Sequence, residues 1–131
     1  MQKFSTFLMF DGKAEQAMNF YTTVFKDARI TAISRYGKNE TGAEGTVKHA
    51  SFTLNGQEFM AIDSSVKQPF TFTPAISIFV KCETVEEIDR LFAKLSEGGQ
   101  VLMPLDRYDF SERFSWVQDK FGVSWQLSLM A

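Results

Sequence analysis

The single histidine of the chain, His49, is the side chain best suited to acid–base chemistry. It lies in the stretch VKHASFTL, where it alternates with the apolar residues Ala50, Phe52 and Leu54, the two-residue period of a half-buried strand. If the apolar set packs against a helix, His49 faces the opposite side of the sheet. An imidazole that titrates near neutral pH would suit a general base or a hydrogen-bonding anchor there. The alternative is a partly exposed histidine without a catalytic role.

A polar stripe in the last predicted strand offers hydrogen-bonding chemistry. The stretch FGVSWQLSL alternates apolar side chains with Ser124, Gln126 and Ser128. The amide of Gln126 carries both donors and an acceptor, so in a pocket it could bind a carbonyl or hydroxyl of a ligand. A buried amide also needs partners when no ligand is present, and Ser77 and Ser124 are candidates. The sequence leaves open whether Gln126 faces a ligand or belongs to a structural network.

Aromatic side chains on the preceding strand could line the same pocket. In RFSWVQD, Trp116 is in phase with Phe114 and Gln118 and could form an aromatic wall of a ligand cavity. A position in an ordinary core is the alternative. Trp125 alternates onto the other face of its strand and is predicted to lie in the core.

Other reactive side chains favour structural roles. Cys82 is the only cysteine, which excludes an internal disulfide or a thiolate metal cluster within one chain, and it is predicted to be a small packed residue. Asp119 precedes the tight turn KFG and is predicted to accept backbone N–H bonds, with Gly122 at positive φ. Asp106 and Asp109 belong to PLDRYDFSERF, which is predicted to be a solvated loop or a subunit contact.

Length and charge limit the class of protein. At 131 residues the chain is predicted to form one domain whose core needs no disulfide or metal. Fourteen basic and sixteen acidic residues give a net charge of -2, and the absence of a basic cluster argues against a nucleic-acid partner. The apolar run from Phe7 to Phe10 is too short for a signal peptide or a membrane span. We therefore expect a cytoplasmic protein without a membrane partner.

The first half of the chain is predicted to contain a strand, a helix and three strands. STFLMF is typical of a strand, and DGKAEQAMNFYTTVF has apolar residues at spacings of three and four, which predict a helix. Two further strands, ARITAISRYG and TVKHASFTL, flank the polar loop KNETGAEG. The dipeptide Asn55-Gly56 predicts a tight hairpin leading into QEFMAID.

The same order recurs after the connector SSVKQPFTFTP. AISIFVKC predicts a strand, and Thr84 with Glu87 predicts a capping box at the start of a helix. Gly98-Gly99 is predicted to end that helix. QVLMPLD, RFSWVQD and VSWQLSL predict three more strands. The apolar face of the helix is predicted to be Val85, Ile88, Leu91, Phe92 and Leu95.

Each half is thus predicted to be a βαβββ module, at about residues 1–63 and about 75–131 within a single domain, 1–131. One helix can cover only one face of a sheet. We therefore expect an α+β fold in which the modules form a curved mixed sheet, with the helices outside and a concave face inside. If Trp125 packs against a helix, Gln126 faces that concavity.

This arrangement resembles the vicinal oxygen chelate superfamily, which includes glyoxalase I, extradiol dioxygenases and bleomycin-resistance proteins. The segments FDGKAEQAMNFY, HASFTLNGQEFMAID, CETVEEIDRLFAKLSEGG and WVQDKFGVSWQLS resemble its PhnB-like branch, often labelled 3-demethylubiquinone-9 3-methyltransferase. The likeness spans nearly the whole chain and implies the glyoxalase/bleomycin-resistance fold. Because members commonly assemble four modules, it also implies a homodimer.

The resemblance implies where a metal or ligand would bind. Metal-dependent members take His or Glu/Gln ligands from the first and last strands of each module. The corresponding positions here are Thr6, Met60 or Ala61, Ser77 and Gln126. Only Gln126 could ligate, and His49 cannot complete a set of three or four ligands, so no metal is expected. No Gly-rich loop of the kind that binds S-adenosylmethionine is evident, so no cofactor is expected either.

Three functions follow as alternatives. The first is a metal-free protein that binds a small, partly aromatic or hydrophobic molecule. The second is an enzyme that acts on a carbonyl or quinone-like substrate with His49 as its base. The third is a dimeric interaction module whose cavity is filled by the rings of Phe10, Phe79 and Phe114. The candidate ligand-binding residues are Thr6, Ser77, Trp116, Ser124 and Gln126.

Overall fold

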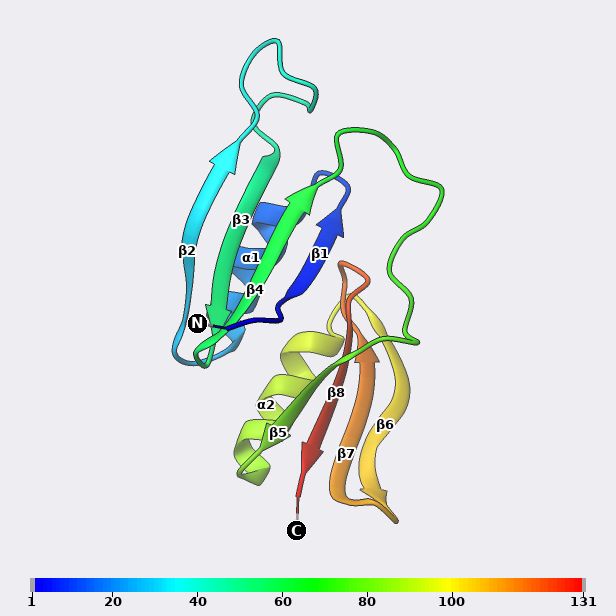
Figure 1. The fold of residues 1–131 in the computed structure, drawn as a ribbon. Coiled ribbons are helices and arrows are strands. Elements are labelled where there is room, and N and C mark those ends of the chain that lie inside the picture. The colour runs from blue at the N-terminus through cyan, green and yellow to red at the C-terminus, as the bar shows by residue number, and fades with distance from the viewer. Residues whose placement is uncertain (1, 131) are drawn as a thin grey trace. The chain divides into compact units, whose positions relative to one another are not determined.

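The structure, a computed structural model, describes residues 2–130. The chain divides into two compact units, with the boundary between Phe70 and Thr71, inside the predicted connector. Each unit is a βαβββ module with one helix, as Figure 1 shows. Among the described residues, neither helix has the length and apolar character needed to cross a membrane. The organisation as one domain stays a prediction.

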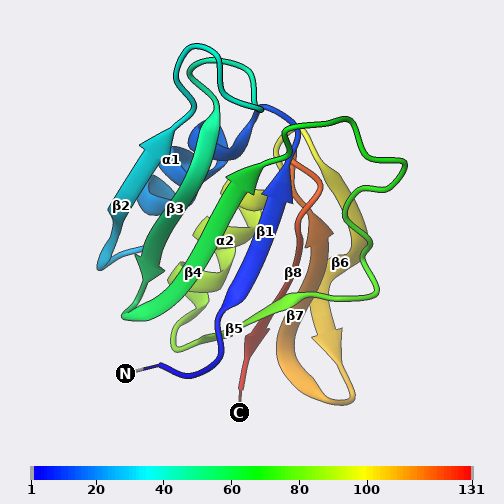
Figure 2. The same ribbon diagram turned by 45° about the horizontal axis from the view of Figure 1, so that its top comes forward.

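The first unit consists of β1 (Thr6–Phe10), α1 (Ala14–Val24), β2 (Ala28–Arg35), β3 (Val47–Leu54) and β4 (Gln57–Asp63). Its strands lie in the order β1-β4-β3-β2, which Figure 2 shows from right to left. Only the β1–β4 pair is parallel among these strands, so the sheet is mixed. Tyr21 of α1 stacks on Phe52, and Phe52 stacks on Phe59, with ring centroids 6.3 and 5.3 Å apart. These rings form the core between α1 and its sheet.

The second unit repeats this arrangement. It consists of β5 (Ile78–Cys82), α2 (Val85–Ser96), β6 (Gln100–Tyr108), β7 (Ser111–Gln118) and β8 (Ser124–Leu129). The strand order is β5-β8-β7-β6, and β5 is parallel to β8. Leu91 and Leu95 of α2 are buried, as are Trp125 and Leu127 of β8. The predicted α+β class and the two βαβββ modules are confirmed, each module with its own mixed sheet, whereas the joining of the modules into one curved sheet stays a prediction.

Local signals in the sequence set the ends of the elements. The Thr84 hydroxyl accepts a hydrogen bond from the Glu87 N–H at 3.1 Å, and the Glu87 carboxylate accepts one from the Glu83 N–H at 2.7 Å. This confirms the predicted cap of α2. Asn55 and Gly56 have φ values of 51° and 81°, which confirms the predicted two-residue hairpin.

The start of α1 is capped from a distant strand. Lys13, at the N-cap position, gives no side-chain hydrogen bond. Instead, the buried carboxylate of Asp63, at the end of β4, accepts hydrogen bonds from the N–H groups of Ala14 and Val47 at 3.0 and 2.8 Å. One side chain thereby ties α1 to β3 and β4, and the negative charge lies at the favourable end of the helix.

The prediction of a solvated loop at PLDRYDFSERF is wrong, because these residues form the end of the β6–β7 hairpin. The alternative of a subunit contact stays a prediction. Most of the charged side chains of this segment are exposed to solvent, and one pairs with α2. Arg113 donates to the Asp89 carboxylate of α2 at 2.7 Å. Val85, the first residue of the predicted apolar face of α2, is 47% exposed and therefore does not belong to the core.

Candidate functional site

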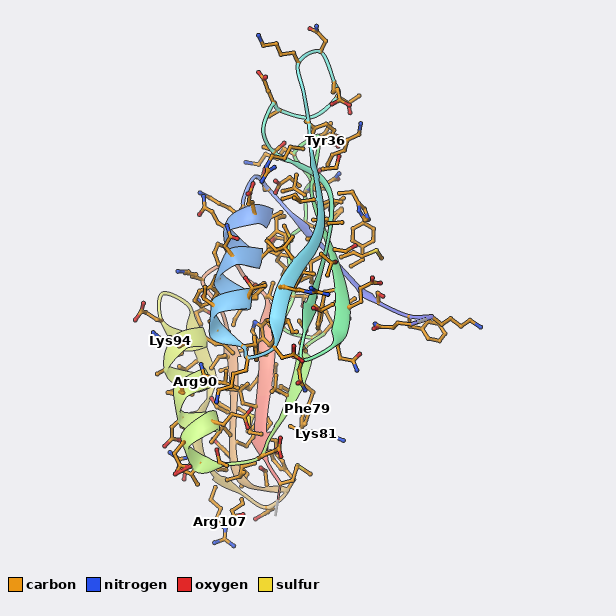
Figure 3. All side chains as sticks on the ribbon, turned by 90° about the vertical axis from the view of Figure 1, so that its left-hand side faces the viewer. Tyr36, Phe79, Lys81, Arg90, Lys94 and Arg107 are labelled. Atoms are coloured by element: carbon orange, nitrogen blue, oxygen red, sulfur yellow. The ribbon has the colours of Figure 1, made fainter. Side chains whose placement is uncertain are left out.

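The face of the second sheet turned away from α2 carries the polar stripe of β8, and we call it the open face. Figure 3 shows Phe79 and Lys81 of β5 on this side of the sheet, with Arg90 and Lys94 of α2 on the other. Strand register brings side chains from three neighbouring strands together on it. On β5, β8 and β7 the open face consists of Phe79, Lys81, Phe114, Trp116, Gln118, Ser124, Gln126 and Ser128. Met103 and Asp106 of β6, in register with Trp116 and Phe114, continue it toward the edge of the sheet.

Gln126 lies in register between two aromatic residues. Its partner on β5 is Phe79 and its partner on β7 is Trp116. Neighbouring strands are about 4.8 Å apart, so the three side chains are direct neighbours on the open face. The ring of Phe79 is 50% exposed, whereas Trp116 and Gln126 are half-buried. An amide flanked by two rings suits a flat molecule that carries a polar group.

A chain of hydrogen bonds joins four of the predicted ligand-binding residues. The indole N–H of Trp116 donates to the Ser124 hydroxyl at 2.8 Å, and the hydroxyls of Ser124 and Ser77 are 2.6 Å apart. The amide nitrogen of Gln126 donates to the Ser77 hydroxyl at 3.3 Å. The structure thus brings Ser77, Trp116, Ser124 and Gln126 together, as the sequence suggested for Gln126 and the two serines.

The chain of hydrogen bonds uses only one side of the Gln126 amide. Among the described residues, no hydrogen bond reaches the carbonyl oxygen of Gln126. The Ser77 bond directs the NH₂ group toward β5 and so orients the amide. An oriented, partly exposed carbonyl oxygen can accept a hydrogen bond from a hydroxyl or N–H group of a ligand.

The two tryptophans have different environments. Trp125 is fully buried, and its indole N–H donates to the carboxylate of Asp119 at 2.8 Å. The same carboxylate accepts from the N–H groups of Phe121 and Val123 at 2.8 and 3.1 Å. The predicted core position of Trp125 and the predicted cap by Asp119 are therefore confirmed. Trp116 alone brings an indole to the open face.

The candidate residues of the first unit lie apart from each other. His49 is exposed on the sheet face opposite α1, with its ring centroid 6.3 Å from that of Phe7. Among the described residues, the His49 side chain makes no hydrogen bond or ion pair. Thr6 pairs with Phe59, which puts its side chain on the α1 side of the sheet. The structure therefore places Thr6 and His49 on opposite faces of the first sheet, and the roles assigned to both residues stay predictions.

The aromatic rings expected to fill a cavity do not act together. Phe10 is 4% exposed and pairs with Asp63, whose carboxylate binds the start of α1, so Phe10 faces α1 rather than the opposite side. Phe114 is 3% exposed, and its ring packs against Tyr108 and Phe110 of the hairpin. Of the expected three rings, Phe79 remains available on the open face.

Sequence reasoning missed the contribution of Lys81 to this face. The alternation of IFVKC places Lys81 on the same side as Phe79, which the sequence had suggested for the cavity. A lysine in the middle of such a strand was the available signal, because a charged side chain must point away from the core.

Cys82 has no features of a nucleophile. The side chain is buried, and this burial, together with the negative charge of Glu87, raises the pKa of its thiol to about 12. A hydrogen bond from the backbone of Ser128 acts in the opposite direction. The thiolate needed for nucleophilic attack is therefore scarce at neutral pH, which supports the prediction of a packed residue.

The raised pKa of Cys82 predicts a loss of stability at alkaline pH. The unfolded chain has a thiol with the ordinary pKa of 9.0, so the folded protein holds the proton more tightly between that pH and about 12. Stability should be unaffected by this group below pH 9 and should fall above it, by up to about 1.4 kcal/mol per pH unit. Urea denaturation at pH 8, 9 and 10 should show a steeper fall for the natural protein than for Cys82→Ala. Equal slopes would contradict the prediction.

The residues of the site do not fit a catalytic metal. A divalent ion of the usual kind needs three or four His, Cys or carboxylate ligands. Within residues 2–130 no group of three or more His, Cys, Asp or Glu side chains could share an ion. On the open face, Gln118 and Gln126 are the side chains related to the usual ligands, and their amide nitrogens donate to the Gly122 carbonyl and the Ser77 hydroxyl.

A nucleotide-like methyl donor does not fit either. Such a cofactor binds at a Gly-rich loop before a helix N-terminus in a parallel sheet. Here the carboxylate of Asp63 occupies the start of α1, and Thr84 and Glu87 cap the start of α2. The sheets contain one parallel pair each among the described strands. We therefore derive no methyl transfer from this site.

Solved structures share this fold. A glyoxalase/bleomycin resistance protein/dioxygenase domain from Frankia sp. EAN1pec has a TM-score of 0.70 at 14% identity, covering 100% of this chain and 93% of that one. The fosfomycin resistance protein FosX from Listeria monocytogenes has a TM-score of 0.66 at 14% identity, covering 100% and 94%. These likenesses confirm the predicted glyoxalase/bleomycin-resistance-like fold.

A nearer relative and a family match go beyond the fold. A PhnB protein from Bacillus cereus is 63% identical, with a TM-score of 0.96, over 98% of this chain and 99% of that one. The family described as 3-demethylubiquinone-9 3-methyltransferase matches residues 2–128, nearly the whole chain. The resemblance seen in the sequence is confirmed, and the chain belongs to the 3-demethylubiquinone-9 3-methyltransferase family.

Proposed function

We propose that this chain is a metal-free protein that binds a small, partly aromatic molecule on the open face of its second unit. The observation that carries the proposal is the position of Gln126, in register between Phe79 and Trp116 with its carbonyl oxygen available. The bonds through Ser77 and Ser124 fix the amide and the indole before a ligand arrives. Groups that are ordered in advance lose less entropy on binding.

The relatives support a small-molecule role. The fold is that of glyoxalase and bleomycin-resistance proteins, and one protein of this fold is described as a fosfomycin resistance protein. The donor set around Gln126 supports binding without a metal. Elemental analysis after dialysis should therefore find far less than one transition-metal ion per chain, and one ion per chain would contradict the metal-free part of the proposal.

Tryptophan fluorescence tests the binding site. A neutral planar probe such as 2-naphthol should quench the emission saturably and be recovered unchanged. Trp116→Phe should remove most of this quenching, because Trp125 is fully buried and engaged by Asp119. Gln126→Leu should weaken binding about tenfold, the effect of one lost hydrogen bond at a partly buried site.

A matched substitution separates the site from general effects on the protein. Gln16→Leu, on the exposed surface of α1, should leave the affinity for 2-naphthol unchanged. If Gln126→Leu and Gln16→Leu gave the same affinity as the natural protein, the open face would not be the binding site. Quenching that never saturates would have the same meaning.

We also propose that the protein is a cytoplasmic homodimer. Large apolar side chains on its surface support an interface, among them Phe4 at 81% and Phe7 at 54% exposure. Sedimentation equilibrium at low micromolar concentration should give about twice the chain mass of 14.9 kDa. A species with the mass of one chain over the whole concentration range would refute the dimer.

A further inference from the structure

We propose that the ligand of the open face is an aromatic anion, whose carboxylate or sulfonate group is bound by Lys81. This inference rests on the proposed function, because it names the class of molecule that the same face would select. It adds a specificity-determining residue that lies outside the chain of hydrogen bonds between Trp116 and Gln126.

Lys81 lies next to the aromatic row on the same side of the sheet. It follows Phe79 by two residues on β5, so their backbone positions are about 7 Å apart and their side chains share a face. Figure 3 shows the two side chains on the same side, opposite Arg90 and Lys94 of α2. A flat molecule stacked beside Phe79 would therefore extend one end toward Lys81 and present another group to Gln126.

Lys81 is available for a ligand. Its side chain is exposed, and among the described residues it belongs to no ion pair. Its register partner on β8 is Ser128, which is 1% exposed and whose hydroxyl lies 2.7 Å from the Ser111 hydroxyl. Ser128 is thus occupied within the protein and leaves Lys81 as the polar group at this end of the face.

The charge beside Phe79 favours an anion. Lys81 is the single charged side chain among the eight residues on β5, β8 and β7, while the carboxylate of Asp106 lies across the sheet on β6, in register with Phe114. The aromatic ring of Phe79 lies next to Lys81 on β5, and aromatic surface excludes water from a bound ligand and strengthens an ion pair formed beside it. A neutral ligand would use the rings and Gln126 but would leave this cation without a partner.

A different role for Lys81 also has a physical basis. β5 is an edge strand, and lysines on edge strands keep sheets from pairing with other chains. This role predicts that Lys81 affects association of the protein with itself and has no effect on ligand selectivity. Binding measurements with a charged probe and its neutral counterpart distinguish the two roles.

The test compares 2-naphthoate with 2-naphthamide, which have the same rings but differ in charge. Isothermal titration at low salt should give an affinity for 2-naphthoate about fivefold higher than for 2-naphthamide, the range of one partly exposed ion pair. Lys81→Gln should abolish this preference without changing the affinity for 2-naphthamide. Lys94→Gln, on α2 at the other side of the sheet, should leave both affinities unchanged.

Each outcome decides between the proposals. If both probes bind with equal affinity and Lys81→Gln changes neither, the anion site is refuted while the binding function of the face stands. If 2-naphthoate loses its advantage equally in Lys81→Gln and Lys94→Gln, the preference comes from overall charge, and the assignment to Lys81 is wrong. If none of the three probes, 2-naphthol, 2-naphthoate and 2-naphthamide, binds, the proposed function itself fails.

Discussion

Replacing Asp119 with alanine is expected to lower the free energy of unfolding by about 3 to 5 kcal/mol, the range for removing one partner of a buried charged network. The carboxylate is 3% exposed and accepts hydrogen bonds from the N–H groups of Phe121 and Val123 and from the indole of Trp125. Without it, two buried donors, the Val123 N–H and the Trp125 indole, and the part-buried Phe121 N–H lose this acceptor. Urea denaturation followed by tryptophan fluorescence measures the effect, since both tryptophans lie in the second unit.

Two further substitutions test the origin of this loss. Asp119→Asn keeps the oxygen that binds the turn but can place an NH₂ group against the Trp125 indole, so it should cost about 2 kcal/mol. Asp109→Ala removes an exposed carboxylate from the β6–β7 hairpin and should change stability by no more than about 0.5 kcal/mol. If Asp119→Ala behaved like Asp109→Ala, the carboxylate would not hold the turn and the strand together.

Asp119 also matters for the proposed site. It fixes the turn that leads into β8, and β8 carries Ser124 and Gln126 on its open side while Trp125 is anchored on the other. A strand whose buried tryptophan is fixed by a hydrogen bond cannot slip by one residue, and such a slip would exchange its two faces. The polar stripe therefore depends on a contact made on the opposite side of the sheet.

Much of the fold could be predicted because local signals and hydrophobic periods agreed. The capping pair Thr84 and Glu87, the Asn55-Gly56 turn and the alternation in VSWQLSL each indicate one structure, and each was found. Both strands of the β6–β7 hairpin were predicted, but their extension to Tyr108 and Ser111 was missed because the charges of this segment suggested a solvated loop. The edge strand of a sheet and its neighbour can carry many charges and still form backbone hydrogen bonds with each other, since their exposed side chains remain in water.

The candidate site was predicted in part. Ser77, Ser124, Trp116 and Gln126 meet as suggested, because alternation in two strands with clear buried partners fixed which side each faces. The face of Thr6 could not be predicted, because TFLMF has apolar residues at both phases of its alternation and the period could not decide between them. The pairing with β4, a long-range contact, decides it instead.

Replacing Gly99 with alanine is expected to destabilise the second unit by about 3 kcal/mol or more. A methyl group at this position would lie 2.0 Å from the carbonyl oxygen of Gln118 and 2.8 Å from the carbonyl carbon of Asp119. Both are backbone atoms at the end of β7, so β6 would have to move away from β7 where their pairing starts, at Gln100. Overpacking that displaces backbone costs more than a clash with a flexible side chain.

The neighbouring glycine provides the control for this substitution. Gly98 has a φ of 75°, and a methyl group there would be 3.3 Å from Lys120 Cβ. Gly98→Ala should therefore cost about 1 kcal/mol, the usual penalty for a left-handed conformation. Urea denaturation of both variants, followed by tryptophan fluorescence, should rank Gly99→Ala clearly below Gly98→Ala. The reverse order would mean that backbone conformation, rather than the close approach of β6 to β7, makes glycine necessary at this corner of the sheet.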